Sequence, residues 1–79
     1  MEPLSLHLMN ILIENDDTLE YLSAKGGWTK NPAVGKTFLT TSVAVRAAKQ
    51  EAMGKFNIVC HIPLTNQLIN LEHGRGAGA

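Results

Sequence analysis

The sequence contains almost no cysteine and no long hydrophobic run. Cys60 is the only cysteine among the 79 residues, which excludes an internal disulfide and argues against a secreted, disulfide-stabilised scaffold. No apolar stretch approaches the roughly 18 residues of a membrane-spanning helix, and no charged segment precedes an apolar run as in a secretory signal. We therefore expect a cytoplasmic protein with no membrane partner.

Aromatic residues are also scarce, so aliphatic side chains must form most of the core. The four aromatic residues are Tyr21, Trp28, Phe38 and Phe56. A chain of this length forms one domain and buries only about 60% of the surface that its unfolded form exposes. The core is therefore thin, and a partner is one of the usual additions that stabilise such a small fold.

The net charge is zero, but the two signs are separated along the chain. Residues 1–20 contain five acidic side chains and no lysine or arginine, whereas residues 21–50 contain five lysine or arginine side chains and no acidic ones. Such a basic segment is one feature of nucleic-acid-binding proteins. The zero net charge favours the other interpretation, in which acidic and basic segments face each other within one chain or between copies.

The tripeptide Gly35-Lys36-Thr37 resembles the end of a phosphate-binding loop. That loop needs another glycine five residues before Gly35, where this sequence has Lys30, and it needs a helix that starts at once. We therefore predict neither a nucleotide site nor any other cofactor. Instead we expect a bend that Asn31-Pro32 opens and that Gly35 closes with a positive φ.

The first half of the chain is typical of short strands. Alternating apolar residues predict a hairpin with strands at about 6–14 and 18–24, although the N-terminal run also fits a helix. Gly26-Gly27 then predicts a tight turn into a short strand at 28–29.

The second half contains the clearest patterns. A cap at 40–42 followed by alanines at helical spacing predicts a helix that ends before Gly54. Alternation predicts a strand at 55–62, and residues 67–71 fit a last strand or a helical turn. We expect one α+β domain, 1–72, with a disordered tail, 73–79. Its fold is a small, mainly antiparallel sheet of three to five strands with one helix packed on one face.

One part of the sequence contains a Tyr-Leu pair, a Gly-Trp-Thr element, a proline, a phenylalanine and an alanine-rich helix. The residues are Tyr21, Leu22, Gly27, Trp28, Thr29, Pro32, Phe38 and 44–48. This pattern resembles small bacterial and phage α+β domains that have no assigned activity. The resemblance implies the same fold class and no function.

No group of residues in the sequence has the types and spacing of an enzyme active site. Cys60 and His61 are adjacent, but neighbours on a strand point to opposite faces, so the histidine cannot activate the thiol. His7, His61 and His73 lack the spacing of zinc ligands, and Asp16-Asp17 fits a solvated turn. We expect no catalytic, cofactor-binding or metal-ligating residues.

The sequence therefore favours a non-enzymatic interaction or structural module that forms a homodimer, and it leaves room for a further protein partner. One helix covers one sheet face, whereas the strands are apolar on both faces. The predicted dimer interface is Leu8, Met9, Ile11, Leu12, Ile13 and Val59. The alternative is a nucleic-acid-binding accessory protein, which we rank lower, with contacts from Lys25, Trp28, Lys30 and Lys36.

Overall fold

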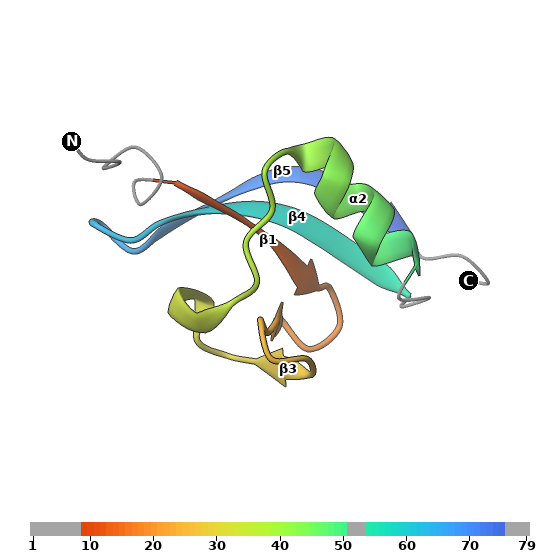
Figure 1. The fold of residues 1–79 in the computed structure, drawn as a ribbon, viewed down its shortest axis with the longest axis horizontal. Helices are drawn as coiled ribbons and strands as arrows, with labels where there is room; N and C mark the ends of the chain where they lie inside the picture. Colours follow the sequence, from red (N-terminus) through yellow and green to blue (C-terminus); the bar gives the residue numbers. More distant parts are fainter. Residues whose placement is uncertain (1–8, 51–53, 76–79) are drawn as a thin grey trace.

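The computed structural model describes residues 9–50 and 54–75 and shows a five-stranded antiparallel sheet with one helix on one face (Figure 1). In chain order the elements are β1 (Asn10–Asn15), β2 (Tyr21–Leu22), β3 (Trp28–Thr29), the 3-10 turn η1 (Pro32–Val34), α2 (Thr41–Gln50), β4 (Lys55–Ile62) and β5 (Gln67–Arg75). The strand order is β3-β2-β1-β4-β5. This arrangement confirms the predicted α+β class.

The turn between β1 and β2 is built around Asn15. Its side-chain oxygen accepts hydrogen bonds from the amides of Asp17 and Thr18 at 2.8 and 3.2 Å, and Leu19 takes a positive φ of 60°. The turn therefore occupies more residues than the alternation predicted, and β2 is reduced to Tyr21–Leu22. The predicted N-terminal strand is observed from Asn10, and residues 1–8 lie outside the described part.

The segment after η1 extends the sheet beside β1, beyond the end of β2. The amide of Lys36 donates to the carbonyl of Leu22 at 2.7 Å, and the amide of Phe38 donates to Ile11 at 2.9 Å. Gly35 closes the turn η1, as predicted, because its amide donates to the carbonyl of Pro32 at 3.1 Å. Its φ is −71°, so the predicted left-handed conformation is wrong; the residue is extended and also forms a bridge with Ser23. The glycine turn at 26–27 is confirmed, since both residues have positive φ.

Helix α2 begins with a side-chain cap and packs through alanines. The Thr40 hydroxyl accepts a hydrogen bond from the Val43 amide at 3.2 Å, as an N-cap does. Ala44 and Ala48 are fully buried, and they belong to a core cluster with Ile13, Leu22, Phe56 and Ile58. Small side chains on this face allow the helix to lie close to the sheet. The predicted end of the helix falls in 51–53, outside the described residues.

The alternation predicted for β4 is confirmed. Phe56 and Ile58 belong to the cluster beneath α2, whereas Val59 packs with Leu12 and Tyr21 in a second cluster. This second cluster lies on the opposite sheet face because neighbouring strand residues point in opposite directions.

Strand β5 is longer than predicted. It runs to Arg75, so the boundary at residue 72 is too early, and only 76–79 of the predicted tail lie outside the described residues. Gly74 pairs with Phe56, and a Cβ atom at Gly74 would lie 2.3 Å from the Phe56 ring. The absence of a side chain at Gly74 therefore makes room for the ring, and this long-range contact accounts for strand structure in a segment with no apolar residues.

Candidate functional site

A row of polar side chains crosses four strands on the face opposite α2. Strand register places Glu14 opposite both Tyr21 and Asn57, and places Asn57 opposite His73. Asn57 lies between Phe56 and Ile58, which face the helix, so its own side chain points to the other face. The row is therefore fixed by backbone pairing among β1, β2, β4 and β5.

Asn57 holds this row together. Its amide nitrogen donates to Glu14 Oε1 at 2.9 Å and to Asp16 Oδ1 at 3.0 Å, and its Oδ1 is hydrogen-bonded to His73 Nδ1. Only 4% of Asn57 is exposed, so these bonds replace its contacts with water. Because both amide protons are directed at carboxylates, we infer that His73 Nδ1 carries the proton that Asn57 accepts. In the neutral imidazole, Nε2 is then the acceptor nitrogen.

Tyr21 stands at one end of the row. Burial raises the pKa of its phenol above the ordinary value of 10.0, and the negative charge of Glu14 and a hydrogen bond to Glu14 raise that pKa further. The phenol is therefore held in its neutral form beside a carboxylate.

This raised pKa predicts a loss of stability in alkali. Because the folded-state pKa of Tyr21 lies above the unfolded value, its contribution to stability is complete below pH 10.0 and declines as pH rises through the folded-state pKa. Tyr21 is the only tyrosine, so a pH titration followed by tyrosinate absorbance in the ultraviolet reports this group alone. The titration midpoint of the folded protein should lie above the midpoint of the protein unfolded in urea. Melting temperatures of Tyr21→Phe should decline less steeply in this pH range. Equal midpoints in the folded and unfolded protein would contradict the assignment.

An open pocket of about 320 Å³ lies at the same end of the sheet as the row. Its charged and polar lining comes from Asp16, Lys55, Asn57, His73 and Arg75. Lys55 and Arg75 are directly opposite each other in the β4–β5 register. The pocket therefore combines two cationic side chains and an imidazole with one carboxylate that is bonded to Asn57.

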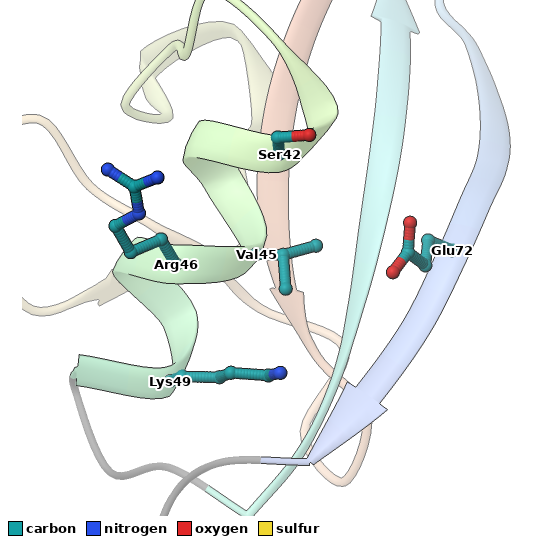
Figure 2. A pocket seen from close by; sticks show the side chains of 5 residues that line it. All are labelled: Ser42, Val45, Arg46, Lys49 and Glu72. Carbon is teal, nitrogen blue, oxygen red and sulfur yellow. The ribbon is translucent and has the colours of Figure 1, made fainter.

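A second pocket, of about 380 Å³, lies between α2 and β5 and is lined by Ser42, Val45, Arg46, Lys49 and Glu72. Figure 2 shows Lys49 and Glu72 extending toward the space between the helix and the strand, whereas Arg46 points away from the sheet. The lining combines the aliphatic side chain of Val45 with the opposite charges of Lys49 and Glu72. It fits an amphipathic side chain and contains no histidine to serve as a base for Ser42.

The adjacent Cys60 and His61 have separate surroundings. Cys60 is a buried free thiol. His61 is also buried; its Nε2 lies 2.9 Å from Asn66 Oδ1, and its Nδ1 has no partner among the described residues. The two residues do not form a thiol–imidazole pair because they sit on opposite faces of β4.

The residues predicted to contact nucleic acid gather partly at one sheet edge. Trp28 lies in the edge strand β3 and is 37% exposed. Lys25 and Lys30 precede and follow this strand, and both are exposed. Lys36 is separate, because its Nζ lies 5.6 Å from the centroid of the Phe38 ring, a cation–π distance.

The residues predicted to form a dimer interface lie mostly inside the single chain. Leu12, Ile13 and Val59 are buried, Ile11 is partly buried, and Met9 is exposed; Leu8 lies outside the described residues. On the second apolar face, Gly35 packs directly over Leu12. A Cβ atom added to Gly35 would lie only 3.3 and 3.4 Å from the two methyl carbons of Leu12. A dimer therefore needs a different surface.

Strand β5, which the sequence analysis did not select, exposes three aliphatic side chains. Leu68, Ile69 and Leu71 are 44%, 46% and 45% exposed on this edge strand. The apolar residues between Gln67 and Leu71 are compatible with a strand, but the sequence does not show that this strand lies at the edge of the sheet.

Within residues 9–50 and 54–75, the side chains form no group of histidine, cysteine or carboxylate residues that could hold a metal ion. In the same part of the chain, no helix is long and apolar enough to cross a membrane.

Comparisons with protein-family models, with curated proteins and with solved structures found no match.

Proposed function

We propose that this protein is a small, non-enzymatic interaction module that self-associates as a two-fold homodimer through the exposed edge of β5. The observation that carries this proposal is a nine-residue edge strand with three half-exposed aliphatic side chains. An edge strand presents unpaired backbone N–H and C=O groups along one side, which favours pairing with another strand.

The two edges of the sheet differ in their capacity for such pairing. The edge strand β3 contains only two residues, whereas β5 contains nine and has neither lysine nor proline, the residues that usually prevent edge-to-edge pairing. The pairing partners Ile58–Glu72 and Val59–Asn70 leave Leu71 as an extra residue in β5. This bulge twists the strand, and we therefore place the pairing in its first half, at 67–70.

A second copy is the partner that this edge fits best. A two-fold axis would pair β5 with its own copy in antiparallel order, so that each apolar side chain near the axis meets an equivalent apolar surface. The zero net charge of the chain imposes no overall repulsion between copies. Burying the half-exposed aliphatic groups would also enlarge the hydrophobic core, which is small because a short chain buries a small fraction of its surface.

The test is to place a lysine on the pairing edge. Ile69→Lys and Leu68→Lys should each weaken self-association at least about tenfold, since either change buries a charge at the interface. Leu64→Lys is the matched control, because Leu64 is 84% exposed in the turn before β5. Sedimentation velocity over a concentration series measures the effect. If the control and the edge variants dissociate equally, the edge is not the interface.

Nucleic-acid binding is the second candidate, supported by the exposed Trp28 between two exposed lysines. Base stacking on an aromatic side chain and phosphate contacts from lysine are the usual means of single-strand binding. We expect only weak, strongly salt-dependent binding of a short fluorescent oligonucleotide. Lys25→Glu and Lys30→Glu should reduce it more than the control Lys49→Glu on α2. Submicromolar affinity at physiological salt would place this function above self-association.

A further inference from the structure

We propose that the pocket formed by Lys55, His73 and Arg75 at the end of the sheet binds a phosphate group, either free or as a small phosphomonoester. The site lies on the sheet face opposite α2, in the pocket of about 320 Å³ described above. It is separate from the 67–70 edge proposed for self-association, and its occupation does not require a dimer.

The first observation is the placement of two cations directly opposite each other. Lys55 pairs with Arg75 in the antiparallel register, and side chains in such pairs have Cβ atoms about 4.5–5.5 Å apart. Like charges in this arrangement destabilise a sheet. An anion bound between them would remove that repulsion, because it interacts favourably with both.

The second observation is that the neighbouring carboxylates are hydrogen-bonded to Asn57 and form no ion pair with Lys55 or Arg75. Glu14 and Asp16 accept hydrogen bonds from the amide of Asn57 at 2.9 and 3.0 Å. Among the described residues, no lysine or arginine nitrogen lies within 4.0 Å of a carboxylate oxygen. Lys55 and Arg75 are therefore not neutralised by ion pairs within this part of the chain.

The third observation is the orientation of His73. Its Nδ1 is engaged with Oδ1 of the buried Asn57, which leaves Nε2 for a ligand. Neutral Nε2 accepts a hydrogen bond from a protonated phosphate oxygen, and the imidazolium form donates one to an unprotonated oxygen. The Arg75 guanidinium supplies a planar pair of donors and Lys55 a point charge, a combination that suits a phosphate group.

Asp16 opposes this binding and supplies a sharp test. Its carboxylate lines the same pocket, so it should lower the affinity for any anion. Asp16→Asn removes the charge and keeps an oxygen that can accept from Asn57. We therefore expect Asp16→Asn to bind phosphate more tightly than the natural sequence.

The experiment is a titration of the amide proton–nitrogen NMR spectrum with inorganic phosphate, at ionic strength held constant with chloride. A second arm uses free phosphoserine, and a third uses acetate. We expect saturable shifts at the amides of Lys55, His73 and Arg75. Lys55→Gln and Arg75→Gln should each weaken binding at least about fivefold, and Asp16→Asn should strengthen it several-fold, since each changes one unit charge at the ligand. The control Lys49→Gln should leave the affinity unchanged.

The arms separate the two sources of the phosphate group. Tighter binding of phosphoserine than of inorganic phosphate identifies a phosphomonoester ligand, and the reverse identifies free phosphate. Shifts that do not saturate, equal responses to acetate, or equal weakening by Lys49→Gln would overturn the proposal, because each would indicate nonspecific charge effects. The spectra also show directly that each variant is folded.

Discussion

Phe56→Ala is expected to lower the free energy of unfolding by about 3–5 kcal/mol, the usual cost of removing a large aromatic side chain from a core. Phe56 is fully buried beneath α2, and its ring occupies the space above Gly74. The total stability of a chain of this length is only of order 4–12 kcal/mol. The variant should therefore unfold at much lower urea concentration, as followed by circular dichroism.

Gly74→Ala tests the same contact from the other strand. The new Cβ would lie 2.3 Å and 2.7 Å from two carbons of the Phe56 ring, so the ring or the strand must shift, at a cost of about 1–3 kcal/mol. In the Phe56→Ala background this clash is absent, and Gly74→Ala should then cost much less, giving a large coupling energy in a double-mutant cycle. Gly54→Ala is the control, because its Cβ would meet nothing within 4 Å. Additive effects of the two substitutions would contradict the observed packing.

The second large effect is expected at Asn57. Asn57→Asp replaces the donor shared by Glu14 and Asp16 with a third carboxylate in a buried position. We expect a loss of at least about 3 kcal/mol at neutral pH, because a buried charge is left among like charges. The loss should shrink in acid, where the introduced carboxyl group becomes neutral.

The control for this substitution is Asn31→Asp, which makes the same chemical change at an exposed position and keeps the side-chain oxygen that accepts from the Ala33 amide. Urea unfolding of both variants at neutral and acid pH measures the difference. Equal stability of the two variants at neutral pH would show that the Asn57 row does not contribute to the fold.

Local patterns in the sequence were sufficient to predict several elements. The period of two in β4 separated Phe56 and Ile58 from Val59, and the structure places them on opposite faces. Thr40 and the alanines that follow predicted a capped helix with a small packing face, which α2 has. These features succeed because capping and amphipathic periodicity are properties of consecutive residues.

The features that sequence reasoning missed depend on contacts between distant residues. Residues 73–75 look like a loop, yet they form the end of β5 because Gly74 fits beneath the Phe56 ring. Asn57 looks like an outward-facing strand residue, and only the pairing of β1 with β4 brings Glu14, 43 positions away, to its amide. The position of β5 at the sheet edge likewise follows from strand order, which the periodicity of one strand does not determine.

The proposed self-association through β5 is tested most directly by the mass of the protein in solution. Light scattering after size exclusion should give about twice the chain mass of 8.6 kDa at micromolar concentration, because pairing of two β5 edges closes a two-fold dimer. The same measurement on Ile69→Lys should give the mass of a single chain. A natural sequence that remains at the single-chain mass at about 100 µM, a concentration at which a stable interface is occupied, would contradict this account.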